Sequence, residues 1–225
     1  MKHTYIYILL ATLLGICFGC ARQTPNGNLL ENDRASIVEK EYDDSLMQIF
    51  FSCANFNQIN RFIDPEIKLT VLYANGCYPQ YEKLDSLSSD PKSYNLPDWV
   101  IDDMFNALDF SNIHIDSLQH INTPVFDGEN VLQCGAFVDE SEGNKVMSSV
   151  IENLIRVEEI EMNDADYIKA LENDSSFYSN MEDKTIRVIL TNADSECPIR
   201  IFHFTTKNNK LYLTLIDLYS YDTSA

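Results

Sequence analysis

The feature that most constrains the fold is a pair of β-rich segments that flank Asn208-Asn209, within residues 200–218. Asparagine tolerates a positive φ, so this dipeptide suits the two-residue type I′ turn of a β-hairpin. The register of a hairpin is counted outward from its turn. We therefore predict four cross-strand pairs: Lys207 with Lys210, Phe204 with Leu213, Phe202 with Leu215, and Arg200 with Asp217.

This register predicts a hairpin with one strongly apolar face and one mixed face. The mixed face carries His203, Thr205, Tyr212 and Thr214. Arg200 and Asp217 form a polar pair on the apolar face, where they make either a buried structural ion pair or the polar floor of a pocket. Together with His203, they are the candidate pocket residues.

The N-terminus has the composition of a secretory signal peptide. A basic start at Lys2 precedes an apolar run of about 14 residues, from Tyr5 to Phe18, and Gly19-Cys20 follows. That run is shorter than the roughly 20 residues that span a bilayer as a helix. The alternative is a buried first helix, but a helix that is apolar all round would have to be enclosed by the domain.

Gly19-Cys20 resembles the lipobox of bacterial lipoproteins, in which a signal peptidase cuts before a cysteine that becomes the acylated first residue. Cys17 and Phe18 depart from the residues usual in that family and resemble the relaxed lipoboxes of the Bacteroidetes. The resemblance implies lipidation of Cys20, and several acyl chains anchor a protein stably. Residues 21–24 lack the marks that resemble inner-membrane retention and surface export, which implies an outer-membrane protein facing the periplasm.

Charge and length limit the class of protein. Removal of residues 1–19 takes away one basic residue, Lys2, so the net charge of −19 becomes −20. Residues 20–33 are polar and predict a flexible tether, and residues 34–225 are long enough for a single well-cored domain. The anionic field argues against nucleic acid as a partner and against adsorption to an anionic membrane. It favours either a cationic partner or solubility alone.

Four cysteines remain besides Cys20: Cys53, Cys77, Cys134 and Cys197. In an oxidising compartment they could form two disulfides in any of three pairings. Free buried thiols are the alternative, because cysteine packs as a small apolar residue. No CxxC pair occurs, which argues against a zinc ribbon or a thioredoxin-like site.

Apolar residues along the rest of the chain recur with helical and strand periods. They predict helices over residues 42–53, 98–108 and 144–160, with Asp98 as an N-cap, and short helices capped by Asn55 and Asn163. They predict strands over residues 67–73, 131–138 and 185–191, turns at Asn75-Gly76 and Asp127-Gly128, and an edge strand at Pro79. The predicted fold class is α+β, with an antiparallel sheet packed on helices and ending in a long hairpin.

The order of these elements resembles the NTF2-like cone fold, in which a curved sheet wraps a helix and makes a pocket open at one end. The closing segment, residues 210–217, resembles the final strand of many NTF2-like proteins. The resemblance implies one curved sheet that joins residues 131–138 and 185–191 to the hairpin. No functional residues carry over from it. The chain also resembles Bacteroidetes-type lipoproteins, which implies a location and no activity.

Signatures of the common enzyme classes are missing from the sequence: G-x-S-x-G, H-E-x-x-H, a Walker loop and a Gly-rich dinucleotide fingerprint. A nucleophilic pair of Cys134 or Cys197 with His203 is arithmetically possible, without any local signature. The oxygen ligands of residues 163–166 lack the glycine and glutamate of an EF-hand, and a helix cap explains them. We predict no cofactor and no metal.

Three classes of function remain. A non-enzymatic binding or envelope-interaction protein leads, because the strongest features are anchor, charge and packing. A pocket enzyme, or a binder of a small apolar ligand, is second and needs titratable groups inside a cavity. A neutraliser of a basic toxin or peptide is third, favoured by the charge. For a protein partner, the first surface to test is Glu158, Glu159 and Glu161 at a helix end.

Overall fold

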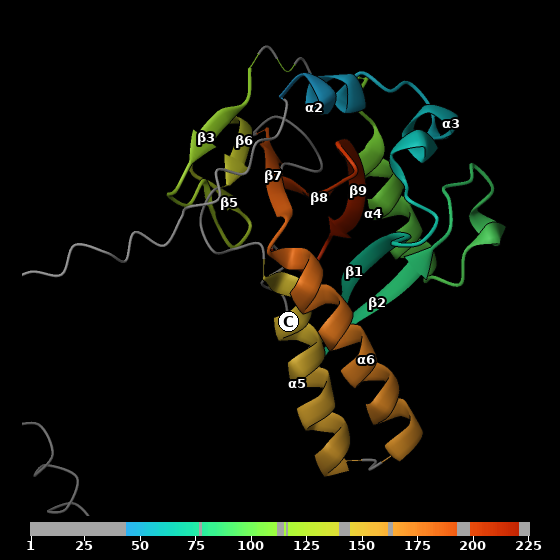
Figure 1. Ribbon diagram of the computed structural model, residues 1–225. Helices are drawn as coiled ribbons and strands as arrows, with labels where there is room; N and C mark the ends of the chain where they lie inside the picture. The colour runs from blue at the N-terminus through green and yellow to red at the C-terminus, as the bar shows by residue number, and fades with distance from the viewer. Residues whose placement is uncertain are drawn as a thin grey trace, which may run out of the picture. The chain divides into compact units, whose positions relative to one another are not determined.

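A mixed sheet of seven strands forms the centre of the structure, a computed structural model (Figure 1). The structure describes residues 44–76, 78–111, 115, 117–139, 145–161, 164–192 and 199–220, and only the backbone of residues 158–161. All of them belong to the compact unit Lys40–Ala225. Within these residues, no helix is long and apolar enough to cross a membrane.

The described elements confirm the α+β class. The large sheet contains β1 (Leu69–Asn75), β2 (Tyr78–Leu84), β3 (Gln119–Ile121), β6 (Gly135–Asp139), β7 (Thr185–Thr191), β8 (Ile199–Lys207) and β9 (Lys210–Asp217). A separate two-stranded ribbon contains β4 (Phe126–Asp127) and β5 (Asn130–Val131). The helices are α2 (Asp44–Phe51), α3 (Phe56–Ile59), α4 (Asp98–Leu108), α5 (Val146–Glu161) and α6 (Ala165–Glu182), with short 3₁₀ turns at Asn60–Phe62 and Pro91–Ser93.

The strand order of the large sheet is β2-β1-β9-β8-β7-β6-β3. Neighbouring strands are antiparallel except for two parallel pairs, β1 with β9 and β3 with β6. Strands β6 and β7 join the hairpin in one sheet, as the resemblance to the cone fold implies. The described sheet is neither closed nor curled, however, so the curvature that makes the pocket of the cone is missing. Helices cover both of its faces.

The C-terminal hairpin confirms the predicted turn. Asn208 and Asn209 have φ values of 53° and 58°, as a type I′ turn requires, and Lys207 pairs with Lys210. Beyond Phe204 and Leu213 the register shifts by one residue, because Thr214 forms a β-bulge. The predicted pairs of Phe202 with Leu215 and of Arg200 with Asp217 are therefore wrong. Phe202 pairs with Ile216, and Ile201 pairs with Asp217.

The bulge decides which face of the sheet Asp217 occupies. Successive side chains of a strand point to opposite faces, so a shift of one residue transfers every later side chain to the other face. Without the bulge, Asp217 would lie on the same face as Leu213, Phe204 and Phe202. With it, Asp217 lies on the opposite face, together with His203.

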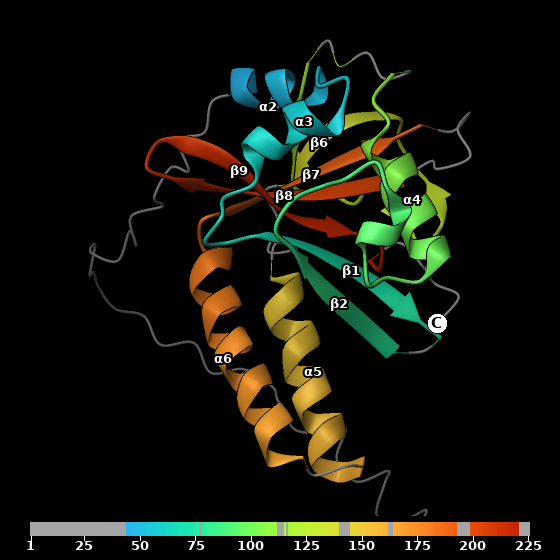
Figure 2. The ribbon, with the colours of Figure 1, turned by 90° about the vertical axis from the view of Figure 1, so that its right-hand side faces the viewer.

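The first face of the sheet is packed under α2, α3 and α4 (Figure 2). Its centre is a cluster of phenylalanine side chains in edge-to-face contact. Phe50 of α2 lies 6.1 Å from Phe202 and 4.9 Å from Phe204 between ring centroids, and it also contacts Phe51, Phe62 and Phe110. Burial of large apolar rings gives this face most of its stabilising free energy.

The second face carries two separate apolar patches. Helices α5 and α6 cover Leu72 and Leu215 of β1 and β9 with Ile151 and Leu171. Residues beside and within the β4–β5 ribbon cover a second patch: Phe137, Ile189, Ile199 and Ile201. A strip of buried polar side chains lies between the two patches. Figures 1 and 2 show α5 and α6 side by side, running away from the sheet as a helical arm.

Other predicted boundaries differ from the structure in detail. Asn55 is the N-cap of α3 as predicted, since its side chain accepts from the N–H of Gln58. The N-cap of α4 is Pro97 and not Asp98, which occupies the first helical position. Asn75 belongs to β1 and pairs with Tyr78, so the turn of the β1–β2 hairpin begins after Asn75 and not at it as predicted.

Helix α6 is much longer than predicted. Its N-cap is Asp164, whose side chain accepts from the N–H groups of Asp166 and Tyr167. The predicted cap, Asn163, lies outside the described residues. The second half of α6 has little apolar periodicity, and contacts with the sheet maintain it: Tyr178 is buried, and its hydroxyl shares a 2.6 Å hydrogen bond with the hydroxyl of Thr70 on β1.

Candidate functional site

The structure brings together two of the three candidate pocket residues. His203 Nε2 lies 3.7 Å from Asp217 Oδ2, and the two side chains are 2% and 0% exposed. Arg200 lies on the first face of the sheet, where its Nη1 donates to the backbone oxygen of Asp109. The bulge at Thr214 separates Arg200 from Asp217 and brings His203 to Asp217 instead.

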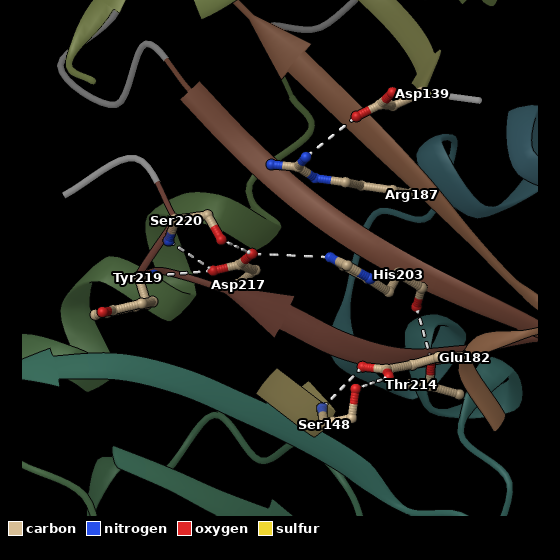
Figure 3. Close-up of polar contacts among 9 residues, drawn as sticks. All are labelled: Asp139, Ser148, Glu182, Arg187, His203, Thr214, Asp217, Tyr219 and Ser220. Carbon is tan, nitrogen blue, oxygen red and sulfur yellow. Dashed lines mark hydrogen bonds and ion pairs between the residues drawn. The ribbon is translucent and has the colours of Figure 1, made fainter. Parts of the chain in front are cut away.

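A row of charged side chains continues from His203 across the second face (Figure 3). Asp139, Arg187 and His203 are direct cross-strand neighbours on β6, β7 and β8. Arg187 Nη1 donates to Asp139 Oδ2 at 3.1 Å, and both side chains are largely buried. We define these three residues and Asp217 as the buried charge row.

Asp217 closes the turn after β9. Its Oδ1 accepts from the N–H groups of Tyr219 at 3.0 Å and Ser220 at 2.8 Å, and its Oδ2 accepts from the hydroxyl of Ser220 (Figure 3). Burial alone would raise the pKa of Asp217. His203, the Ser220 hydroxyl and the Arg187 charge together outweigh burial and hold this pKa below its ordinary value.

His203 has the fewest hydrogen bonds from its side chain of the four residues in the buried charge row. Its Nε2 is too far from Asp217 for a hydrogen bond, and among the described residues neither this atom nor Nε of Arg187 has a hydrogen-bond partner. Burial lowers the pKa of His203, although the Asp217 carboxylate acts in the opposite direction. A general base must reach its substrate. At 2% exposure, His203 is a buried structural residue of the sheet.

Glu182, at the end of α6, is a further buried carboxylate and caps a neighbouring helix. Its Oε1 accepts from the N–H of Ser148 at 3.1 Å, and its Oε2 accepts from the Ser148 hydroxyl (Figure 3). Ser148 lies in the first turn of α5, where backbone N–H groups lack helical partners and the helix dipole favours a negative charge. Glu182 therefore joins the two helices of the arm at the sheet.

A partner can reach an open groove beside strand β2, at the edge of the sheet. The groove has a volume of about 710 Å³. Five consecutive β2 residues, Tyr78 to Glu82, line it together with Tyr73 and Asn95 and, from the arm, Leu154, Val157 and Tyr167. We call it the β2 groove. Tyr78 and Tyr167 are 51% and 46% exposed.

The lining residues show that the β2 groove follows the free edge of the strand. Successive strand residues point to opposite faces, so a groove over one face of β2 would be lined by alternate residues only. This groove is lined by every residue from Tyr78 to Glu82. Strand β2 is the outermost strand of the sheet, and its only strand neighbour among the described residues is β1.

Contacts from α6 hold the arm beside β2. Asp174 accepts hydrogen bonds from the hydroxyl of Tyr81 and from Nζ of Lys83, both at 2.7 Å. Burial, and then Asp174, raise the pKa of Tyr81 well above its ordinary value, so its hydroxyl remains a donor. Nζ of Lys83 also lies over the rings of Phe177 and Tyr178, at 5.5 and 5.2 Å from their centroids.

A second groove, of about 910 Å³, lies between α2, α3 and α4 and has aromatic walls from Phe51, Phe56, Phe105 and Phe110. Cys53 lines it and carries a free thiol. Burial raises the pKa of Cys53, so the thiol is not activated as a nucleophile. Neither His203 nor Asp217 lines this groove or the β2 groove.

The remaining predicted sites are resolved only in part. Cys53 and Cys134 are free thiols, and Cys134 is exposed whereas Cys53 is partly buried. Cys77, Cys197 and the lipidation site Cys20 lie outside the described residues. The part of the chain that the structure describes contains no cluster of side chains able to hold a metal ion. The side chains of the acidic run at residues 158–161 are also outside the description.

Sequence reasoning missed Arg187, Asp139 and Glu182 in the buried polar strip, and it missed the β2 groove. A charged residue inside an otherwise apolar strand, as Arg187 is in β7, is the signal that could have indicated the buried charge row. Comparison with protein-family models, curated proteins and solved structures finds no match for this chain.

Proposed function

We propose that this protein is a non-enzymatic interaction module of the cell envelope, anchored by a lipid on Cys20 at the outer membrane and facing the periplasm, and that it binds its partner in the β2 groove. The observation that carries the proposal is the composition of this groove. Four tyrosines, Tyr73, Tyr78, Tyr81 and Tyr167, line it. Tyrosine is enriched at protein interfaces because it combines a large apolar ring with a hydrogen-bonding hydroxyl.

The polar chemistry of the fold supports binding rather than catalysis. The titratable groups of the buried charge row are enclosed in the sheet and act as caps and ion pairs. Four aromatic side chains are exposed among the described residues: Tyr78 and Tyr167 line the β2 groove, Phe177 lies on the arm, and Trp99 of α4 packs against Tyr73 of the groove. Exposed aromatic side chains beside a groove are typical of an interaction surface.

The anchor proposal rests on residues 1–20 and is tested in cells. Metabolic labelling with a fatty-acid analogue is expected to mark the wild-type chain and to leave the Cys20→Ala variant unmarked. Label that persists on Cys20→Ala would remove the lipid anchor from the proposal and leave the groove untouched.

Site-specific photo-cross-linking tests the groove. A benzophenone amino acid at position 167, in the groove, is expected to give a discrete protein adduct on illumination of intact cells. The matched control is the same amino acid at position 132, since Leu132 is 58% exposed but does not line the groove. Equal adducts at both positions, or none at position 167, would contradict binding in the β2 groove.

The groove between α2, α3 and α4 supports a second candidate, the binding of a small apolar ligand. Its volume of about 910 Å³ lies within the range of ligand sites, and its walls are aromatic. Native mass spectrometry of the purified chain would show an added mass that denaturation removes. A clean apo mass would eliminate this candidate.

A further inference from the structure

We propose that the β2 groove takes an extended, basic peptide segment, which adds to the sheet as a strand along the free edge of β2. This inference rests on the proposed function, because it names the class of partner for the same groove. Three observations carry it: the phase of the free backbone groups on β2, the side chains that line the groove, and the charge of the arm.

Pro79 indicates which backbone groups of β2 face the groove. In an antiparallel pair, the backbone groups of alternate residues point toward the neighbouring strand, and those between point away. Proline has no N–H, so in a sheet it occupies an outward position of an edge strand. Tyr81 shares this phase within the groove, and Lys83 continues it along the same edge just beyond the groove. Their N–H and C=O groups, with the C=O of Pro79, form a row to which a strand can pair.

The side chains of the groove favour a cationic strand. Glu82 is the charged residue among the described lining residues, and no lysine or arginine is among them. Tyrosine rings attract ammonium and guanidinium groups through their negative faces. A peptide with lysine or arginine at alternate positions can therefore place its charges against Glu82 and the rings while its backbone pairs with β2.

The charge of the helical arm extends this preference beyond the groove. Helices α5 and α6 each contain four acidic residues and one basic residue, a net charge of −6 for the two helices together. The whole chain carries −19. A field of this sign accelerates the approach of a basic segment and repels nucleic acid and acidic peptides.

Peptide binding to the full-length chain in detergent micelles tests the inference. The probe is a fluorescent peptide of about six residues, the usual length of a strand, that alternates lysine and valine. The anisotropy of the peptide reports binding. The fluorescence of Trp99 reports the site, because the ring of Trp99 packs edge-on against that of Tyr73 in the groove, with 6.0 Å between ring centroids. A control peptide that is methylated on every backbone nitrogen should bind at least about tenfold more weakly, because it lacks the N–H donors that pair with β2.

Two matched variants separate local from overall charge. Glu82→Lys, in the groove, is expected to weaken binding at least about fivefold, whereas Glu129→Lys makes the same charge change at the exposed β4–β5 turn and should alter it less than about twofold. Thermal unfolding verifies that both variants fold. Equal affinities for the methylated and unmethylated peptides, or for the two variants, would overturn strand addition by a basic peptide.

The two groove proposals can fail separately. A cross-linked partner at position 167 together with no binding of the lysine peptide would overturn strand addition and leave the interaction module intact. Tight binding of the peptide without any cross-linked partner in cells would support the groove chemistry and contradict its use in the envelope. Preference for the matching glutamate peptide would refute the charge argument directly.

Discussion

The two faces of the central sheet are stabilised in different ways. The first face, under α2, α3 and α4, is closed by phenylalanine rings in edge-to-face contact around Phe50. The second face has two smaller apolar patches, and the buried charge row and Glu182 lie between them. Both faces are equally inaccessible to solvent at their centres, so the difference is one of chemistry.

The apolar first face contributes most of the stability, whereas the polar second face fixes the register of the strands. Apolar packing is non-directional, and the first face would tolerate several arrangements of similar rings. Hydrogen bonds and charges require defined geometry. The bulge at Thr214 turns Asp217 to the second face beside His203, and the N–H groups of Tyr219 and Ser220 donate to its carboxylate there. The Thr214 hydroxyl also donates to the backbone oxygen of His203 at 3.1 Å.

The largest effect is expected from truncation on the first face. Phe50→Ala should lower the free energy of unfolding by roughly 3–5 kcal/mol, because it removes a fully buried ring and leaves a cavity. The control is Ile49→Ala, whose side chain is 55% exposed and should cost less than about 0.5 kcal/mol. Urea denaturation measures both. Similar losses in the two variants would mean that the cluster does not dominate stability.

An intermediate effect is expected on the second face. Arg187→Met should cost roughly 2–3 kcal/mol, because Asp139 loses the guanidinium that neutralises it in a largely buried position. Adding Asp139→Leu should restore part of the loss, since an apolar pair replaces an ion pair. The comparison of the two variants by denaturant unfolding is decisive. A double variant less stable than Arg187→Met would show that Asp139 stabilises the fold by contacts other than its ion pair with Arg187.

The smallest effect concerns pH and the second face alone. The pKa of His203 is lowered by burial, so the unfolded chain binds more protons below about pH 6.5, and the free energy of unfolding falls as the pH drops from there. One proton accounts for at most about 1.4 kcal/mol per pH unit. Asp217, whose pKa is also lowered, contributes stability above about pH 3.9 that is lost at lower pH.

Replacement of the histidine isolates its share of this pH dependence. His203→Gln keeps a polar side chain of similar size and should flatten the curve between about pH 5 and 6.5, while the decline at lower pH remains. Denaturant unfolding at a series of pH values measures it. An unchanged slope in His203→Gln would assign the pH dependence to other groups.

Local conformational preference determined several features that the sequence alone predicted. The φ preference of asparagine predicted the turn at Asn208-Asn209, and the alternation of apolar residues predicted the bounds of β7. The capping preference of Asn55 predicted the start of α3, and the missing N–H of Pro79 predicted that β2 is an edge strand. Such features involve residues close together in the chain. For that reason they were predictable.

Tertiary contacts decided the rest. The bulge at Thr214 brings His203 to Asp217, and it depends on how β8 and β9 pack in the sheet. The length of α6 depends on contacts with residues distant in the sequence: Tyr178 bonds to Thr70, and Glu182 bonds to Ser148. Counting from a turn cannot detect a single inserted residue, yet that residue transfers Asp217 from one face of the sheet to the other. The β2 groove arises likewise, because Asp174 of α6 binds Tyr81 and Lys83 and holds the arm beside an edge that the sequence could only mark as free.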